Sequence, residues 1–216
     1  MAKRPFLLRR VRRYALERVG GVSLVVFPDV LNPVVFRSGD YFARVIERIP
    51  LAEPPAGLAP ARALDMGTGT GVAALFAARR GYQVVAVDLN PEAVRCARIN
   101  ALMNRAEERI EVRQGDLFAP VAGEQFDLIL FNPPFFRGQP RDLFDMAWRS
   151  IDVPERFASG LLTMLRPGGK ALILLSTDGD ASSLLAALEH SALTVQVAAR
   201  RHFGSEIMTV YCAQRP

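Results

Sequence analysis

From residue 61 onward, short apolar runs alternate with segments of helical periodicity, and this alternation constrains the fold more than any other feature. It is typical of a mostly parallel sheet whose crossover helices pack against it. We therefore predict an α/β fold in which the last two strands form an antiparallel pair around Phe203-Gly204. The predicted strands cover 61–66, 83–87, 109–113, 126–131, 170–176, 193–199 and 206–212. The predicted helices cover 72–80, 90–103, 152–165 and 181–190.

The chain before this body divides at a Pro-rich stretch. Residues 50–60 contain four prolines and predict a connector between an N-terminal region, 1–49, and the main domain, 61–216. Residues 1–20 hold seven basic residues and one acidic residue, with an apolar stripe at roughly helical spacing. This pattern predicts a basic amphipathic helix, which either contacts RNA, the ribosome or another acidic partner or docks on the domain through its stripe.

Polar residues follow four of the predicted strands at the point where each strand ends. They are Asp65, Asp88, Asp116 and Asn132. In an open α/β sheet, ligands bind at the carboxyl ends of the strands. The sequence therefore predicts a ligand site where these four residues meet.

A glycine loop connects the first strand of the body to its helix. Gly67, Gly69 and Gly71 alternate with other residues, which allows a tight turn and a close approach to a ligand. The dinucleotide-binding fingerprint G-x-G-x-x-G does not fit, because the third glycine comes one residue early, and the Gly-Lys-Ser/Thr of a phosphate loop is absent. The alternative is an ordinary strand-to-helix turn, but the acids before the loop and after the next strand favour a binding site.

Asp88 ends the second strand, where a carboxylate can accept hydrogen bonds from two ribose hydroxyls. It could instead be a first-turn acid of the next helix, although Asn90 already supplies the cap of that helix, with Pro91 at its first position. Asp116 follows Gly115 and either binds an adenine amine or forms an Asp turn.

The motif Asn132-Pro133-Pro134-Phe135 follows a buried apolar strand. Two consecutive prolines fix the backbone and leave carbonyl groups without local partners. With the amide oxygen of Asn132, these carbonyls can hold both hydrogens of a target –NH2 group, while Phe135 can stack on the planar group that carries it. A rigid loop with a capping Asn is the alternative, but it would leave Phe135 and Phe136 as exposed aromatic side chains.

Taken in order, these motifs resemble the class I methyltransferases, and specifically the HemK-type group with its N-P-P-Y/F motif, the methyltransferase small domain. The resemblance covers roughly residues 60–215. It implies a Rossmann-like α/β fold with a mostly parallel seven-stranded sheet, an antiparallel last strand and helices on both faces. It also implies S-adenosyl-L-methionine as the cofactor, S-adenosyl-L-homocysteine as the product and an N-methyltransferase activity.

The resemblance assigns roles to individual residues. The three glycines of the loop would line the methionine end of the cofactor with Asp65 behind them, Asp88 would hold the ribose, and Asp116 with Leu117 would face the adenine. The full set expected to bind the cofactor is Asp65, Gly67, Thr68, Gly69, Gly71, Asp88, Leu89, Asp116, Leu117 and Asn132. The residues expected to position the acceptor nitrogen are Asn132, Pro133, Pro134 and Phe135.

Residues 33–42 are similar to the Pro-x-x-Asp-Thr-Phe segment of small HemK-type enzymes that act on the glutamine of a translation release factor, with Tyr41 in place of Thr. This similarity implies the glutamine side-chain amide as the acceptor. An exocyclic amine of adenine or guanine in RNA or DNA is the alternative, because N-P-P-F also serves base methyltransferases and residues 1–20 are basic. A non-catalytic module that kept the fold is a third reading, against which the intact loop, Asp88 and Asn132 argue.

The cysteines, the apolar runs and the histidines indicate the cellular setting of the protein and whether it binds a membrane or a metal. Cys96 and Cys212 lie in apolar periodic segments and are expected to be buried, reduced thiols of a cytoplasmic protein. No apolar run is long enough to span a bilayer, so no membrane partner is expected. His190 and His202 lack partners at ligand spacing, and no metal site is expected. We expect a monomer, with residues 137–141 and Trp148 either bordering the acceptor cleft or serving as loop and core.

Overall fold

The computed structural model describes residues 11–50 and 60–215. Its centre is a seven-stranded sheet with the order β10-β11-β9-β6-β3-β4-β5. The strands β3, β4, β5, β6 and β9 run parallel to their neighbours in this group, whereas β11 runs antiparallel to both β9 and β10. The bounds are β3 Arg62–Met66, β4 Gln83–Asp88, β5 Ile110–Gln114, β6 Phe126–Phe131, β9 Leu165–Ser176, β10 Thr194–Phe203 and β11 Glu206–Gln214. The predicted mostly parallel seven-stranded sheet with an antiparallel last strand is confirmed.

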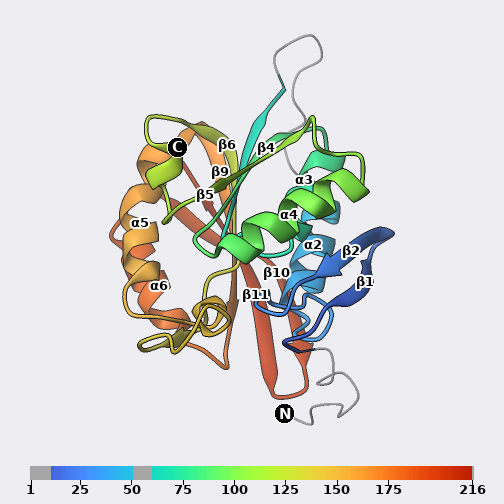
Figure 1. Cartoon of the computed structure of the whole chain (residues 1–216). Coiled ribbons are helices and arrows are strands. Elements are labelled where there is room, and N and C mark those ends of the chain that lie inside the picture. The colour runs from blue at the N-terminus through green and yellow to red at the C-terminus, as the bar shows by residue number, and fades with distance from the viewer. Residues whose placement is uncertain (1–10, 51–59, 216) are drawn as a thin grey trace.

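Helices cover both faces of the sheet, as predicted (Figure 1). One face packs against α2 (Ser38–Arg48), α3 (Val72–Arg79) and α4 (Pro91–Met103), and the other packs against α5 (Val153–Met164) and α6 (Ala181–Glu189). Each face has its own apolar core, the first built around Phe42 and Phe76 and the second around Phe157 and Leu161, all four of which are fully buried. Strands β3 and β4 are therefore apolar on both sides, which explains why they appear in the sequence as continuous apolar runs.

The predicted helix start at Asn90 is confirmed. The Asn90 Oδ1 atom accepts a hydrogen bond from the Glu92 backbone N–H at 2.9 Å, and Pro91 occupies the first helical position. This cap satisfies one of the backbone donors left without a partner at the start of a helix. It also fixes where β4 ends and α4 begins, directly beside Asp88.

Strand β9 is longer than predicted, because it begins at residue 165 rather than 170. Its register with β6 shifts between the pairs Phe126↔Leu165 and Leu128↔Lys170, so that residues 166–169 bulge out of the ladder. Pro167 has no N–H to donate to the ladder, and Gly168 has a positive φ of 73°. The Arg-Pro-Gly-Gly segment thus ends α5, as expected, and then forms a bulge.

The helix predicted within residues 1–20 is wrong for residues 15–19. This segment is strand β1 (Ala15–Val19), which pairs antiparallel with β2 (Val22–Val26). Gly20 and Gly21 connect the strands with φ of 48° and 80°, the two positive values that a tight hairpin turn requires. Residues 1–10 lie outside the described residues, and their part of the prediction stays untested.

The hairpin packs against the main domain, as one of the two alternatives for this segment expected, but as strands rather than as a helix (Figure 1). Val19, Val22 and Leu24 are buried in the same core as α3. The Asn100 side chain of α4 accepts a hydrogen bond from Val25 N and donates one to Val25 O, both at 2.8 Å. In β1 the burial alternates with a period of two rather than 3.6, so that Glu17 and Val19 are buried while Leu16 is 76% exposed. The division at residues 50–60 stays a prediction, since 51–59 lie outside the described residues.

Two smaller expectations can be compared with the structure. Cys96 and Cys212 are both free and buried, as predicted. Across residues 11–50 and 60–215, no helix combines the length and the apolar character that a membrane span needs.

Candidate functional site

A cavity of about 340 Å³ lies at the carboxyl edge of the sheet, and its volume falls in the range of small-molecule sites. Three groups of residues line it. The first comes from the lead-in segment 29–39, and the second comes from the loops after β3, β4, β5 and β6. The third comes from the insert, which we define as residues 136–152 between β6 and α5. Among the four polar residues predicted to meet at this edge, Asp88, Asp116 and Asn132 line the cavity, and Asp65 lies behind its wall.

Two of the three glycines of the glycine loop line the cavity. Gly67 and Gly69 line it, with positive φ of 64° and 55°. Gly71 does not line it, and a Cβ at Gly71 would lie 3.2 Å from the Ala97 Cβ of α4. Gly71 therefore allows the start of α3 to pack closely on α4. Its predicted contact with the methionine end of the cofactor stays a prediction without support from the cavity lining.

Asp65 holds the glycine loop from behind. Its Oδ2 atom accepts hydrogen bonds from Thr68 Oγ1 at 2.6 Å and from the Ala74 backbone N–H at 3.0 Å. These bonds join the end of β3 to the loop and to the first turn of α3. The side chain is buried, and burial raises the pKa of Asp65 to about 7 even though both hydrogen bonds lower it. Asp65 is therefore a support for the loop that takes up a proton near neutral pH.

Asp88 ties the glycine loop to the start of α4. Its Oδ2 atom accepts a hydrogen bond from Gly69 N at 2.8 Å, and its Oδ1 atom accepts one from Asn90 N at 2.9 Å. Burial raises the pKa of Asp88 above its usual range. Each carboxylate oxygen has a second lone pair, so the side chain can anchor the loop and still accept from a ligand in the cavity that it lines. Leu89 also lines the cavity and is 46% exposed.

Asp116 and Leu117 also line the cavity. The Asp116 carboxylate forms an ion pair with Arg156 of α5, which also lies 3.6 Å from Asp152. Leu117 has a positive φ of 46°, which is uncommon for a residue with a branched side chain and marks a constrained position. The carboxylate therefore has a protein partner, while the Leu117 side chain offers an apolar contact.

Asn132 presents a buried acceptor without a partner. Its Nδ2 atom lies 3.4 Å from Ser38 Oγ at the start of α2. Its Oδ1 atom is buried and has no hydrogen-bond partner among the described residues. Leaving a buried acceptor unpaired costs about 1–3 kcal/mol, which a ligand donor can recover. Because Asn132 lines the cavity, a ligand bound there can supply that donor.

The residues after Asn132 divide between two environments. Pro134 lines the cavity, but Pro133 and Phe135 do not. The Phe135 side chain packs against the core on the α2 and α3 face. The stacking of Phe135 on an acceptor stays a prediction, and Phe135 is not among the residues that line the cavity.

The support of the corner that follows Asn132 was not predicted from the sequence. The carbonyl oxygen of Phe135 accepts a hydrogen bond from Asp180 N at 2.7 Å. A Cβ at Gly179 would come within 2.6 Å of the Phe135 Cβ and would collide with the Phe135 carbonyl, so only glycine fits there. The available signal was the polar segment Thr177-Asp178-Gly179-Asp180 after strand β9, since it repeats the pattern of polar residues at a strand end.

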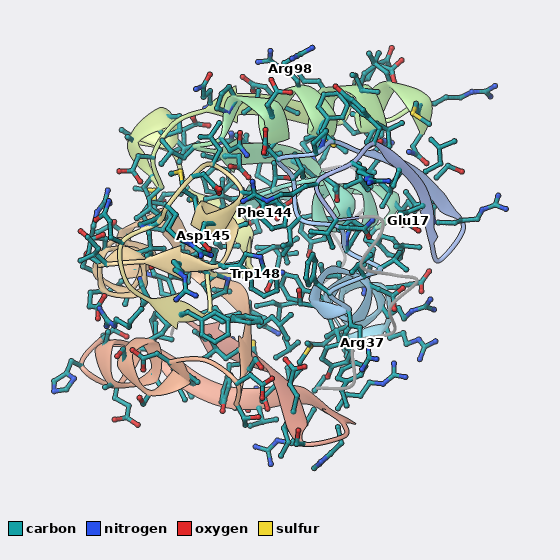
Figure 2. All side chains as sticks on the ribbon, turned by 60° about the horizontal axis from the view of Figure 1, so that its bottom comes forward. Glu17, Arg37, Arg98, Phe144, Asp145 and Trp148 are labelled. Atoms are coloured by element: carbon teal, nitrogen blue, oxygen red, sulfur yellow. The ribbon has the colours of Figure 1, made fainter. Side chains whose placement is uncertain are left out.

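The insert is held together by charged and aromatic contacts. The pair β7 (Phe136–Arg137) and β8 (Arg149–Ser150) closes it, around the short helix η2 (Asp145–Ala147). Figure 2 shows Phe144, Asp145 and Trp148 grouped on this segment. The Asp145 carboxylate accepts a hydrogen bond from Arg141 Nε at 3.0 Å, and Arg141 lowers the pKa of Asp145 to about 2.

Of residues 137–141 and Trp148, which were expected either to border the acceptor cleft or to serve as loop and core, only some line the cavity. Gln139 and Pro140 line the cavity. Trp148 does not, because its ring packs edge-on against Phe36 of the lead-in segment with centroids 4.6 Å apart. Trp148 is thus the hydrophobic anchor that joins the insert to the lead-in segment.

The lead-in segment contributes more than the sequence suggested. Pro33, Ser38 and Gly39 line the cavity, in agreement with the similarity noted for residues 33–42. Asp29 also lines it, and its carbonyl accepts a hydrogen bond from Asn90 Nδ2 at 2.8 Å. Nothing in the local sequence marked Asp29, since only the folded chain brings it beside α4. Within the residues that the structure describes, no group of three His, Cys, Asp or Glu side chains could hold a metal ion.

Comparison with solved structures defines the class of fold. The 16S rRNA N2 G1207 methyltransferase RsmC of T. thermophilus, solved with AdoMet and guanosine, has a TM-score of 0.68 at 22% identity and is matched over 94% of this chain and 50% of its own. The Mtq2 structure of E. cuniculi, a complex with Trm112 that methylates the termination factor eRF1, has a TM-score of 0.62 at 21% identity, with 87% and 99% coverage. At these identities the likeness shows the fold alone, and that fold is the class I methyltransferase fold.

Sequence comparison identifies the family. The model of the methyltransferase small domain matches residues 51–203, and the chain belongs to this family. A putative protein N5-glutamine methyltransferase of Methanocaldococcus jannaschii is 32% identical over 161 residues, which are 70% of this chain and 80% of that protein. A tRNA1(Val) (adenine(37)-N6)-methyltransferase of Porphyromonas gingivalis is 34% identical over 137 residues, which are 58% of this chain and 54% of the relative. The chain thus spans about half the length of that relative.

Proposed function

We propose that this chain is an S-adenosyl-L-methionine-dependent N-methyltransferase that acts on a planar –NH2 group. The first candidate acceptor is the glutamine side-chain amide of a translation release factor. The observation that carries the proposal is the Oδ1 atom of Asn132, which is buried and has no hydrogen-bond partner among the described residues. Asn132 itself lines the cavity. A planar –NH2 group supplies the donor that this oxygen lacks.

The cofactor half of the cavity fits S-adenosyl-L-methionine. Gly67 and Gly69 would lie along the methionine end, where the absence of a Cβ allows a close approach to the backbone. Asp88 would accept hydrogen bonds from the ribose hydroxyls, and Leu117 would lie against the adenine. When bound, the cofactor supplies a methyl group that its sulfonium has already activated for transfer. Family membership supports this assignment.

The chain then has to orient the acceptor and stabilise charge. In an amide or a base amine the nitrogen lone pair is delocalised, which makes the nitrogen a poor nucleophile. A hydrogen bond from the –NH2 group to Asn132 Oδ1 would favour the geometry that frees the lone pair, and would stabilise the developing positive charge. The Pro133 carbonyl, the second acceptor expected from the motif, belongs to a residue that does not line the cavity. With the cofactor bound, the acceptor nitrogen would gain the methyl group that the sulfonium loses with its bonding pair left on sulfur, and the nitrogen would then release a proton to water. The product is S-adenosyl-L-homocysteine, and no general base is needed.

Two kinds of relative support the choice of acceptor. The putative glutamine methyltransferase is matched over most of its length, and the release factor glutamine methyltransferase of Escherichia coli is 44% identical over 82 residues, which are 37% of this chain and 29% of that protein. The second candidate acceptor is an exocyclic base amine in RNA or DNA. The tRNA adenine methyltransferase relative and the basic residues 1–20 favour it. The buried free thiols favour a cytoplasmic setting.

A methyl-transfer assay tests the proposal. Purified chain with tritiated S-adenosyl-L-methionine is offered release factor, transfer RNA and ribosomal RNA in parallel, and the labelled product is digested to identify the modified residue. We expect methylglutamine from the release factor. Label in a base would select the second candidate acceptor. The absence of label in all three substrates, with cofactor binding intact, would contradict the proposed activity for these substrates.

A further inference from the structure

The tip of the β10–β11 hairpin forms a cationic and aromatic surface beside the cavity. Figure 1 shows this tip projecting at the edge of the sheet where the insert also lies. We define the hairpin patch as Arg37, Arg200, Arg201, His202 and Phe203. Arg200, Arg201 and His202 are exposed, and Phe203 is half-buried. Arg200 and Arg201 lie on opposite sides of β10, because successive residues of a strand point to opposite faces.

Phe203 is the centre of the patch. The Arg37 Cζ atom lies 5.6 Å from the centre of the Phe203 ring, and the Arg201 Cζ atom lies 4.9 Å from it. Tyr41 of α2 contacts the same ring edge-on at 5.8 Å. The ring thus brings two guanidinium groups from distant parts of the sequence to one place, in the geometry of cation–π contacts.

Arg37 adopts a backbone conformation that arginine rarely adopts. It precedes α2 with a φ of 64°, in the left-handed region. Such a conformation costs of order 1–3 kcal/mol for a residue other than glycine and persists where the surrounding structure imposes it, often at functional sites. The next residue is Ser38, whose Oγ atom is the partner of Asn132 Nδ2. The patch and the proposed acceptor site are therefore one residue apart along the chain.

The charges of the patch are not neutralised within the described part of the chain. Arg37, Arg200 and Arg201 form no ion pair with any carboxylate there, and Arg200 Nε donates only to Thr209 Oγ1 at 3.3 Å. The insert on the other side of the cavity is different. There, each arginine pairs with an acid, as Arg137 does with Glu155 and Asp180. An anionic partner is therefore attracted to one side of the cavity mouth.

We propose that the hairpin patch binds the phosphate backbone of an RNA strand and leads that strand to the cavity. Guanidinium groups match phosphate oxygens with two parallel hydrogen bonds, and those on both sides of an edge strand can contact successive phosphates. RNA is favoured over an acidic protein because stacked arginine and aromatic planes suit unpaired bases as well as phosphates. The inference rests on the proposed function for its second candidate acceptor, a base amine, but the binding itself does not require methyl transfer.

Edge strands also carry charges that prevent pairing with other chains, and β10 is an edge strand. That role explains a charge on β10, but it does not explain Arg37, which precedes α2 and is held over Phe203. Lysine would also prevent edge-strand pairing as well as arginine does. Replacing Arg37 and Arg201 by lysine therefore separates the two roles, since lysine keeps the charge but loses the bidentate and stacked geometry.

The test measures RNA binding by the full chain. Fluorescence anisotropy with a labelled oligouridylate of about 16 nucleotides gives the Kd and its dependence on salt. For Arg37→Gln/Arg201→Gln we expect the Kd to rise about tenfold, and the slope of log K against log salt to fall by about 1.4, which is 0.7 for each lost phosphate contact. Arg37→Lys/Arg201→Lys should give an intermediate Kd. The matched control is Arg105→Gln/Arg109→Gln, which removes the same charge from the loop between α4 and β5.

Each other outcome overturns the inference. The first is that the wild type does not bind RNA, and the second is that the control variant loses as much RNA affinity as Arg37→Gln/Arg201→Gln. The third is that polyglutamate at equal charge displaces the RNA, which would identify an acidic protein as the partner. Calorimetry with S-adenosyl-L-methionine checks that the variants remain folded. RNA binding is measured without S-adenosyl-L-methionine, so a failure of the patch leaves the proposed methyl transfer standing, and a failure of methyl transfer leaves RNA binding measurable.

Discussion

The two halves of the cavity are built in different ways. The cofactor half, which we define as the glycine loop together with Asp65 and Asp88, is held by hydrogen bonds between side chains at strand ends and the backbone of neighbouring loops. Asp65 reaches Thr68 and Ala74 within its own strand-to-helix unit, and Asp88 reaches Gly69 from the next strand. All of these partners lie in the loop after β3 or in the first turn of α3.

The acceptor half, formed by Asn132, the insert and the lead-in segment, draws on residues far apart in the sequence. Asn132 meets Ser38, which is 94 residues away. Arg12 forms an ion pair with Asp142, 130 residues away, at 2.5 Å. Trp148 packs on Phe36. The contacts are ion pairs and aromatic pairs rather than bonds to a regular backbone.

Because the two halves are built differently, we expect that the acceptor half can be altered without weakening cofactor binding. The cofactor half depends on a sheet that is fixed by its two cores, so a change in the insert should leave cofactor affinity intact. The acceptor half depends on the packing of loops, and a shift of about 1 Å there can reduce the rate about a hundredfold without weakening cofactor binding. The predictions below test this separation.

The largest effect is expected for Asn132→Ala. Removing an acceptor that stabilises charge only in the transition state should lower kcat about 100- to 1,000-fold. Calorimetry should show a cofactor Kd within about twofold of the wild type, because the bonds of the glycine loop are untouched. Asn132→Asp keeps an acceptor and serves as the conservative variant. A rate for Asn132→Ala equal to that of the wild type would contradict the assigned role.

Gly179→Ala should lower kcat by roughly tenfold to a hundredfold, because the added Cβ pushes on the Phe135 carbonyl and moves the corner that follows Asn132. Cofactor affinity should not change. Gly123→Ala is the matched control: Gly123 also has no Cβ, but nothing lies within 4 Å of the added atom, and its φ of 81° makes the substitution costly for stability only. A loss of thermal stability in both variants with full activity in Gly179→Ala would argue against a positioning role.

Asp88→Ala should raise the cofactor Kd by roughly tenfold to a hundredfold, since it removes an acceptor for the ribose and two bonds that shape the loop. The rate at saturating cofactor should change much less than for Asn132→Ala. Asp88→Asn keeps an oxygen acceptor and should fall between the wild type and Asp88→Ala. If calorimetry gives the same Kd for all three proteins, Asp88 does not contact the cofactor.

Asp65 predicts a pH dependence of stability. Its folded pKa of about 7 lies above the ordinary value of 3.8, so the folded chain holds a proton that the unfolded chain has lost. The stabilisation is present at low pH and is lost as pH rises through 7, which amounts to about 2 kcal/mol between about pH 5 and pH 7. Urea unfolding of the wild type and of Asp65→Asn should show this slope in the wild type only. Parallel pH profiles would contradict the raised pKa.

The regular elements of the main domain could be predicted from the sequence because each carries its signal locally. Continuous apolar runs, the Asn90-Pro91 cap and the Arg-Pro-Gly-Gly stop depend on neighbouring residues only. The polar tips were predictable for the same reason, because parallel strands bring their carboxyl ends to one edge. The prediction of a helix is wrong for residues 15–19, the first strand of the hairpin, because apolar spacing alone does not reveal the turn at Gly20-Gly21.

The tertiary structure determines which residues line the cavity and which residues support them from outside it. The sequence placed Gly71 and Phe135 at the site, but packing against Ala97 and the first core turns both away from the cavity lining. It did not mark Asp29 or Gly179, because their partners lie on other elements of the chain. Local signals determine helices and strands, whereas the direction of a loop residue follows from contacts between segments that are distant in sequence and meet only after the sheet has formed.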